Sequence, residues 1–302
     1  MNALVEIAGK QVRIRGKLPC IARLEADKYQ FIDDPEAIIA GLKSCGIRAD
    51  IFTFMQRLPE QTPKYKYPME MDNLAALRVT TFDDWFMKQI GFKARNKAKQ
   101  AEKKGAVVRE VPFSDELVKG IWQIYNETPI RQGRKFPHYG KSYETVYKEE
   151  ATFLESSVFA GAFYEGALIG FTKLVFDETK TQAGLMNIVS MMKHREKAPT
   201  NALIAQAVRS CADRQISYLV YSNFSYGEKQ RSSLSDFKER NAFARFDLPR
   251  YYVPLTPLGA ISLKMGLHHK FSERIPESIA AKVREARQAW YKRKYPTAAE
   301  SF

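Results

Sequence analysis

Cysteine and long apolar runs are both scarce in this sequence. Its 302 residues include three cysteines, Cys20, Cys45 and Cys211, an odd number at wide spacing. A disulfide framework is therefore not expected, and a reducing compartment is favoured. No apolar run reaches the roughly 18 residues that span a membrane, and the N-terminus lacks the continuous apolar segment of a signal peptide. These absences argue against secretion and membrane spanning and predict a cytoplasmic protein.

The sequence also lacks a metal-binding pattern. It has four histidines and no CxxC or clustered Cys/His spacing of the kind that binds zinc. His268 and His269 are adjacent but isolated from other ligand types, which is typical of a surface or packing feature. We therefore predict no metal site and no permanently bound cofactor.

Acidic residues are few relative to basic ones. Lysine and arginine together number 48 against 34 aspartates and glutamates, which gives a net charge of +14. This excess favours a polyanionic partner: nucleic acid such as tRNA or DNA, a pyrophosphate-bearing substrate, or an anionic membrane surface, which would place the protein at the inner membrane face. Solubility alone is an equally good explanation. The length and the 45% hydrophobic content allow one large domain or two of ordinary size.

The most informative stretch is Ala183–Phe224, whose pattern predicts a strand, a basic loop, a helix and a second strand. Pro199 begins the helix, because proline is tolerated in a first turn. The helix would start at the edge of two neighbouring strands, an arrangement suited to an anion- or acyl-binding crevice, although an ordinary βαβ unit with a solvated loop fits equally. The candidate donor- or acyl-binding residues are Ser190, Lys193, His194, Arg195, Lys197, Thr200, Asn201, Tyr221 and Asn223.

A second informative stretch, Phe82–Lys104, predicts a helix with Asp83 and Asp84 in its first turn and a kink at Gly91. Its back half is strongly basic, which suits a phosphate backbone or a pyrophosphate, or is simply a solvated face. The candidate polyanion-binding residues are Lys93, Arg95, Lys97, Lys99 and Lys103.

The remaining elements follow from periodicity, caps and turn residues. In the first eighty residues we predict a hairpin over Met1–Arg15, a helix starting at Asp34–Pro35, strands over Ala49–Phe54 and Ala75–Val79, and a connector over Leu58–Asn73. Beyond Gly105 we predict a strand over Val107–Val111, a helix over Ser114–Tyr125, an irregular segment over Asn126–Lys141, a helix over Ser142–Ser156, a hairpin of Val158–Tyr164 and Leu168–Phe176, a short helix over Leu234–Asn241 and a last strand over Tyr251–Leu255.

The tail, Pro276–Pro296, predicts a basic amphipathic helix. It could bind anionic lipid or nucleic acid, but we expect it to pack Val283 and Trp290 on the body and to expose its basic face.

The order of these elements is similar to that of the GNAT acyltransferase superfamily. Four segments resemble its FemAB/FemX-like branch, the peptidoglycan aminoacyltransferases and their relatives: RNKAKQAEKKGAVV (95–108), FAGAFYEGALIGFTKLVF (159–176), APTNALIAQAV (198–208) and SDFKERNAFARFDLPRYYVPL (235–255). The last segment contains a Phe-Lys pair, but Ala242–Phe243 stands where the branch has glycine. The resemblance implies an α/β fold with a mixed sheet, a GNAT-type fold in tandem with a reduced N-terminal GNAT-like half.

The resemblance also divides the chain. It implies a small N-terminal α/β half over 1–80, a basic connecting helix over 81–105, a GNAT-type acyltransferase domain over 106–260 and a basic helical tail over 261–302.

The activity that the resemblance implies is direct N-acyl transfer. An amine acceptor, such as a cell-wall or glycan precursor or a modified nucleic acid, would attack an activated donor, acyl-CoA or aminoacyl-tRNA as co-substrate, while backbone N–H groups stabilise the oxyanion. Coenzyme A-dependent members carry a glycine-rich pyrophosphate loop, but here Lys193–Asn201 has the sequence KHREKAPTN. This departure favours aminoacyl-tRNA. The competing hypothesis is a nucleic-acid-binding module on a catalytically degenerate GNAT fold.

Catalytic candidates come from the irregular segments. Glu127 is a candidate general base, or simply a surface acid at a helix end, and His138 with Tyr139 is a candidate proton relay. Tyr226 is a candidate proton donor to the leaving group, with aromatic packing as its alternative role. The candidate phosphate- or substrate-binding residues are Arg131, Arg134, Lys135, Lys238 and Arg240.

Overall fold

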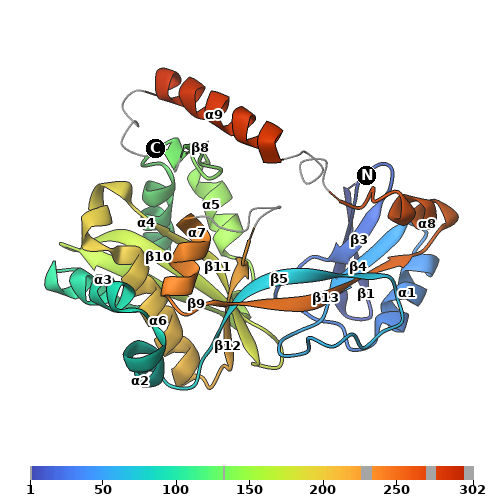
Figure 1. Cartoon of the computed structure of the whole chain (residues 1–302), viewed down its shortest axis with the longest axis horizontal. Coiled ribbons are helices and arrows are strands. Elements are labelled where there is room, and N and C mark those ends of the chain that lie inside the picture. The colour runs from blue at the N-terminus through green and yellow to red at the C-terminus, as the bar shows by residue number, and fades with distance from the viewer. Residues whose placement is uncertain (1, 132, 226–232, 270–276, 296–302) are drawn as a thin grey trace.

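The computed structural model describes residues 2–131, 133–225, 233–269 and 277–295. One mixed sheet of eleven strands runs through the molecule (Figure 1). Its order is β1 (Asn2–Ile7), β2 (Lys10–Arg15), β3 (Ile21–Leu24), β4 (Ile51–Met55), β13 (Ala244–Pro254), β5 (Met69–Arg78), β12 (Tyr218–Asn223), β11 (Gln182–Ser190), β10 (Ala167–Phe176), β9 (Ser157–Tyr164) and β6 (Val107–Val111). The predicted mixed α/β class is confirmed.

The N-terminal half begins with the predicted hairpin. β1 and β2 are antiparallel and turn at Ala8 and Gly9, whose φ angles of 47° and 70° suit a tight hairpin turn. α1 (Pro35–Ser44) starts where the sequence predicts, because Pro35 takes the first helical position and the Asp34 carboxylate accepts hydrogen bonds from two N–H groups of the first turn. One apolar core joins α1 to the strands of this half.

Two long strands, β5 and β13, join the halves. They are antiparallel partners; β13 also pairs with β4, and β5 also pairs with β12. Figure 1 shows both strands running from one half into the other. Tyr251 of β13 buries its ring in the N-terminal core, whereas Ala75 and Leu77 of β5 belong to the core around the C-terminal helices. Each half is therefore completed by a strand from the other part of the chain.

The C-terminal half follows the predicted order. After β6 come α4 (Asp115–Tyr125), α5 (Tyr143–Glu150), β9, β10, β11, α6 (Pro199–Asp213), β12, α7 (Ser233–Arg240) and β13. The apolar face of α6, including Cys211, is buried against the sheet, and all three cysteines are free. The predicted irregular segment contains a short two-stranded sheet, β7 (Ile130–Arg131) and β8 (Arg134–Lys135).

Several elements differ from the prediction, and for the strands the reason is that pairing with distant segments overrides the local pattern. β5 starts at Met69, inside the predicted connector, and β13 starts at Ala244 rather than Tyr251, since each strand pairs with the other along this stretch. β3 was not predicted; it is a four-residue strand held by β2 and β4. α5 ends at Glu150, and only Leu154–Ser156 of the remainder is helical, as a 3₁₀ turn (η2).

The predicted helix over 82–104 is broken rather than kinked. α2 (Phe82–Asp84) passes into a π-helical turn, η1 (Trp85–Gln89), then Ile90 and Gly91 are extended, and α3 (Phe92–Lys103) begins after them. The Arg95 guanidinium closes the break, because it donates hydrogen bonds to the carbonyls of Met87 (2.7 Å) and Ile90 (3.3 Å).

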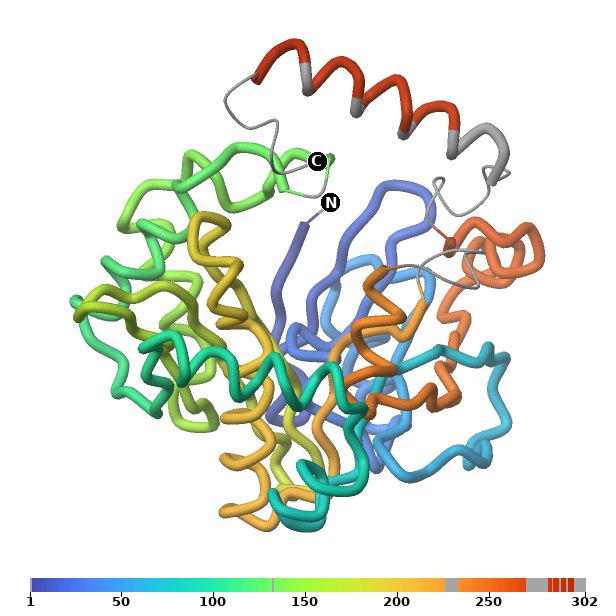
Figure 2. The backbone as a smooth tube through the Cα atoms, turned by 60° about the vertical axis from the view of Figure 1, so that its left-hand side comes forward, coloured from blue at the N-terminus to red at the C-terminus, as the bar shows by residue number. Residues whose placement is uncertain are grey.

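The tail forms the predicted helix, α9 (Glu277–Lys294), after α8 (Pro257–Lys264). Figures 1 and 2 show α9 at the edge of the molecule, and it lies near β8 of the C-terminal half. The side chains of Val283 and Trp290 are 58% and 52% exposed, so the expected packing of these residues on the body is wrong. In the part of the chain that the structure describes, no helix combines the length and apolarity needed to cross a membrane.

Gly259 of α8 offers a test of how closely this helix packs against the N-terminal half. A Cβ atom at Gly259 would lie 1.9 Å from the backbone oxygen of Asp50, so α8 must move if this glycine is replaced. We expect Gly259→Ala to lower the free energy of unfolding by about 1–3 kcal/mol in urea denaturation. Ile261→Ala, at a 54% exposed position of the same helix, is the control and should change it by less than about 0.5 kcal/mol. Equal effects of the two substitutions would contradict this close contact.

Candidate active site

The parallel strands β11 and β12 separate after a short paired stretch. Their pairing covers Gln182–Gly184 with Tyr218–Val220 and then ends. Beyond it lies a cleft of about 870 Å³ between α3, β11, the N-terminus of α6, β12 and α7. The predicted strand–helix–strand unit is thus confirmed, and its two strands open a cleft as a crevice requires.

A second cavity of about 260 Å³ adjoins the cleft on the side of the N-terminal half. Tyr29, Met55 and Leu74 contribute to its lining. Ile188, Val189 and Tyr221 line both cavities. The two spaces therefore meet at the opening between β11 and β12.

Both strands are irregular where they separate. The register of β11 against β10 shifts at Met186, and the register of β12 against β5 shifts between Val220 and Asn223. Ser222 lies within this second shift and has a φ of 53°, a left-handed conformation that costs a serine about 1 kcal/mol or more. Such local strain is commonly stored at functional sites.

The N-terminus of α6 opens into the cleft. Its capping position is Ala198, which has no polar side chain, and Pro199, Thr200 and Asn201 all line the cleft. Asn201 lies inside the first turn, where its N–H donates to the carbonyl of Ala198 at 3.1 Å. The Ser190 and Thr200 hydroxyl oxygens are 2.8 Å apart, which ties the end of β11 to the helix start.

Solved structures share this architecture at low identity. The C-terminal domain of a proposed lysylphosphatidylglycerol synthetase from Agrobacterium fabrum is 14% identical with a TM-score of 0.56, and the L-PGS of Bacillus licheniformis is 13% identical with a TM-score of 0.57. Each match covers 87% of both chains. FemX is 11% identical with a TM-score of 0.55 over 86% of this chain and 89% of its own. The chain has a GNAT-type, FemAB/FemX-like fold. No model of a protein family matches the sequence, and neither does any curated protein.

The cleft of this GNAT-type fold is strongly positive. Among its described lining residues are five cations and no carboxylate; the cations are Lys93, Lys97, Arg131, Arg195 and Arg240. The predicted polyanion-binding set is divided by the structure. Lys93 and Lys97 face the cleft from α3, whereas Arg95 is bonded to backbone carbonyls, Lys99 lies over the Phe86 ring, and Lys103 is exposed in the last turn.

The predicted basic loop of the GNAT-type unit is a short 3₁₀ helix, η3 (Met192–Lys197). Arg195 lines the cleft. Lys193, His194 and Lys197 lie outside the described lining: Lys193 is exposed, Lys197 lies 3.8 Å from the centroid of the Tyr164 ring, and the His194 ring is 5.7 Å from that ring.

Glu127 is the residue that holds this segment in place. Its carboxylate accepts hydrogen bonds from the backbone N–H groups of Met192 (2.7 Å) and Lys193 (3.0 Å) and from the Arg131 guanidinium (3.2 Å). Arg131 also donates to the carbonyls of Ser190 (2.7 Å) and Ile124 (3.0 Å). The pair therefore fastens the end of β11 to α4, and each oxygen of the Glu127 carboxylate accepts at least one of these hydrogen bonds.

The other candidates from the irregular segment lie away from the cleft. His138 stacks on Tyr125 at 4.2 Å, and burial together with the nearby Lys141 ammonium lowers its pKa. Tyr139 is 41% exposed, and Arg134 and Lys135 are exposed on β8. Tyr226 lies outside the described residues.

Lys238 of α7 is fully buried beside the opening. Its ammonium donates a hydrogen bond to the carbonyl of Asn223 and lies 4.9 Å from the centroid of the Tyr221 ring. Burial lowers the pKa of Lys238 to about 8. Asn223 lines the smaller cavity, and its side-chain amide donates to Asp72 at 3.2 Å. A buried positive charge thus stands behind the strand end where the two cavities meet.

A buried polar network near the smaller cavity was not predicted. The Glu150 carboxylate accepts hydrogen bonds from the Tyr125 hydroxyl (2.9 Å) and the Asn187 amide (2.9 Å), and Asn187 lines the cavity. Lys173 is buried beside it and donates to the carbonyl of Glu150 at 2.7 Å. Burial raises the pKa of Glu150 and lowers that of Lys173 to about 8. A lysine isolated in an apolar strand was the one signal available in the sequence.

The contacts of Glu127 generate a prediction about its role. Glu127→Gln removes the charge that pairs with Arg131 and can accept from fewer donors, so we expect the free energy of unfolding to fall by about 1.5–3 kcal/mol. Glu149→Gln is the matched control, because Glu149 pairs with Lys141 at a 42% exposed position and should contribute less than about 1 kcal/mol. Urea denaturation of both variants checks this. Unchanged stability of Glu127→Gln, together with a lost chemical step, would instead support the general-base role.

Proposed function

We propose that the protein transfers an acyl or aminoacyl group from an activated donor to an amine, by direct attack and without a covalent enzyme intermediate. The observation that carries this proposal is the opening between β11 and β12, where the two cavities share Ile188, Val189 and Tyr221. A donor in the larger cleft would meet an acceptor in the smaller cavity through this opening. Holding the donor and the acceptor close together in the correct orientation supplies much of the rate enhancement that such a reaction needs.

The donor that we propose is aminoacyl-tRNA, with acyl-CoA as the competing candidate. Coenzyme A calls for backbone N–H groups around its pyrophosphate, yet residues 193–201 contain no glycine, and the N–H groups of Met192 and Lys193 are already bonded to Glu127. Side-chain cations line the cleft instead. Cations spread along a groove suit the separated phosphates of an RNA end.

The names of similar proteins agree with an aminoacyl donor. One of the matched structures is named as a lysylphosphatidylglycerol synthetase, that is, for the joining of a lysyl group to a phospholipid. Identities of 11–14% limit the likeness to the fold. The names therefore agree with the proposed reaction class by analogy, and they identify no particular substrate.

The chemistry that we propose uses few groups. Backbone N–H groups of β11 beyond Gly184, where pairing with β12 ends, would bind the carbonyl oxygen of the tetrahedral intermediate. The N–C bond forms as the ester C–O bond breaks, and the amine proton passes to the leaving oxygen through the Tyr221 hydroxyl. Lys238 acts from behind Tyr221, where its charge favours the developing negative charge. In this scheme Tyr221 takes the role predicted for Tyr226.

The smaller cavity would receive the amine-bearing end of the acceptor. At about 260 Å³ it accommodates a side chain or sugar amine rather than a whole precursor. Polar groups at its rim, including Asn187 and Asn223, can orient an amine. We propose a cell-wall or glycan precursor, or a modified nucleic acid, as the acceptor.

A nucleic-acid-binding module remains the second candidate function, and the absence of carboxylates from the described cleft lining favours it. Such a module needs the positive cleft but not the opening between the strands. The two functions therefore differ in what Tyr221 contributes.

Tyr221→Phe separates them. We expect transfer to fall by about 100-fold or more, because one positioned proton donor is lost, while donor binding stays within about twofold. The transfer rate is measured in single-turnover reactions from aminoacyl-tRNA or acetyl-CoA to a panel of amines. Donor binding is measured by fluorescence anisotropy of labelled tRNA. Tight RNA binding by the wild-type protein with no transfer to any amine would favour the binding module.

Reversing two cleft charges identifies the donor class. We expect Lys93→Glu with Lys97→Glu to weaken tRNA binding by about tenfold or more and to reduce the slope of log K against log salt by about 2. Lys17→Glu with Lys66→Glu makes the same change of charge on exposed residues of the N-terminal half and is the control. If both pairs act equally, the cleft is not the RNA site; if acetyl-CoA alone binds and is affected, coenzyme A is the donor.

A further inference from the structure

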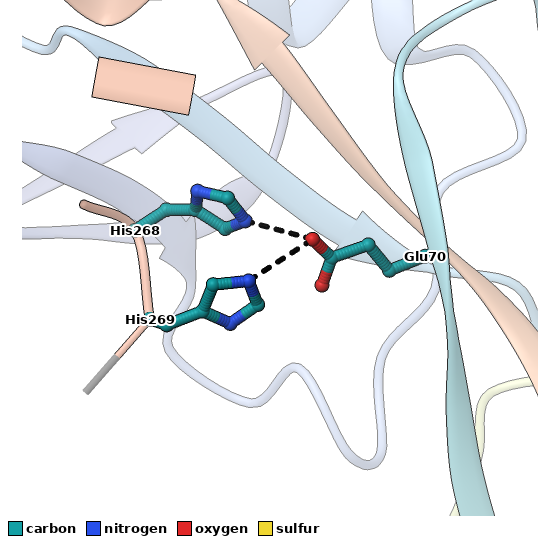
Figure 3. Close-up of side chains that lie close together, drawn as sticks. All are labelled: Glu70, His268 and His269. Atoms are coloured by element: carbon teal, nitrogen blue, oxygen red, sulfur yellow. Dashed lines mark hydrogen bonds and ion pairs between the residues drawn. The ribbon is translucent and has the colours of Figure 1, made fainter. Parts of the chain in front are cut away.

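Three metal-ligand side chains converge outside the cleft. Glu70, near the start of β5, lies 198 residues before His268 in sequence, and His268 and His269 follow α8. Figure 3 shows both imidazoles directed at one oxygen of the Glu70 carboxylate. The Nε2 atoms of His268 and His269 lie 2.9 Å and 3.1 Å from that oxygen. One ligand atom from each residue lies within 4.8 Å of the others.

These distances are close to those of a bound zinc ion. With Zn–N and Zn–O bonds of about 2.0–2.2 Å, tetrahedral ligand atoms are about 3.3–3.5 Å apart. The two nitrogen–oxygen separations are shorter than this by a few tenths of an ångström. An ion could therefore enter between the three atoms with a small outward shift of the exposed Glu70 side chain.

The surroundings hold the two imidazoles in this position. The side chain of His268 is 5% exposed, so its ring is fixed by burial with Nε2 facing Glu70. The two imidazole centroids are only 4.0 Å apart, and the Tyr252 ring lies 4.6 Å from His268. Without a metal, both rings must donate to one carboxylate oxygen at close quarters. Two imidazole nitrogens and one carboxylate oxygen are a ligand set that suits zinc better than it suits magnesium or calcium.

We propose that Glu70, His268 and His269 bind one Zn²⁺ ion, with water as the fourth ligand. The site lies outside the described lining of both cavities, so it is separate from the proposed transfer reaction. Its ion would clasp the turn after α8 to the beginning of β5.

The test uses the full, untagged chain, freed of metal with EDTA and titrated with ZnCl₂ against a chromophoric chelator. We expect one ion per chain, and we expect His268→Ala, His269→Ala and Glu70→Gln each to weaken binding at least tenfold. His194→Ala removes a histidine elsewhere and is the control, with unchanged affinity. A raised melting temperature on adding Zn²⁺ to the wild-type protein, absent in Glu70→Gln, is the second readout.

Two results would overturn the proposal. One is a wild-type affinity no higher than that of the three variants, which would place any bound zinc elsewhere. The other is a Co²⁺ complex without the visible absorption of tetrahedral coordination. Melting temperatures measured in EDTA show whether each variant still folds. If a histidine variant does not fold, Glu70→Gln still tests the proposal, because Glu70 is exposed.

Discussion

The end of β11 is held on one side by β10 and on the other by an ion pair in place of β12, and the site depends on this ion pair. Where β11 leaves β12, the lost pairing is replaced by Arg131, which binds the carbonyl of Ser190, and by Glu127, which binds two N–H groups just beyond the strand. Burial of the pair makes it costly to remove either member alone. The sheet can stay open here because Glu127 and Arg131, from the segment that follows α4, supply the hydrogen bonds that β12 does not.

The same pair bears on which donor the cleft accepts. The N–H groups bonded to Glu127 begin the segment that corresponds to the glycine-rich loop of the coenzyme A-dependent enzymes that the sequence resembles, and Glu127 brings a negative charge to it. In the proposed function, phosphate would instead be bound by the side chains of α3, η3 and α7. Long side chains can bind phosphates that are spread apart better than they can surround a single pyrophosphate. This is the physical reason for favouring aminoacyl-tRNA over coenzyme A as the proposed donor.

Much of the fold was predictable, because strong local signals mark it. Asp34–Pro35, Ser114 and Pro199 begin helices as predicted, and the apolar face of α6 is read directly from its 3.6-residue period. Pairings between distant segments were not predictable, as with β3 and the first residues of β13 and β5. In the site, Arg195, Thr200 and Tyr221 were named from the strand–helix–strand unit and Arg131 from the irregular segment before it, and the structure places all four around the cleft. The contacts of Glu127 with the start of η3 and the Glu150 network join groups 23 to 66 residues apart, which no local pattern reports.

The exchange of β5 and β13 between the halves has a consequence for synthesis on the ribosome. β4 pairs with β13, so its outer edge stays unpaired until residues beyond 244 have left the exit tunnel. Tyr251 then fills the N-terminal core and binds Gln56 and the backbone of Lys64. β4 is therefore made well before the strand that completes its edge. A growing chain would expose this edge while the residues between β4 and β13 are translated, a period in which chaperones matter most.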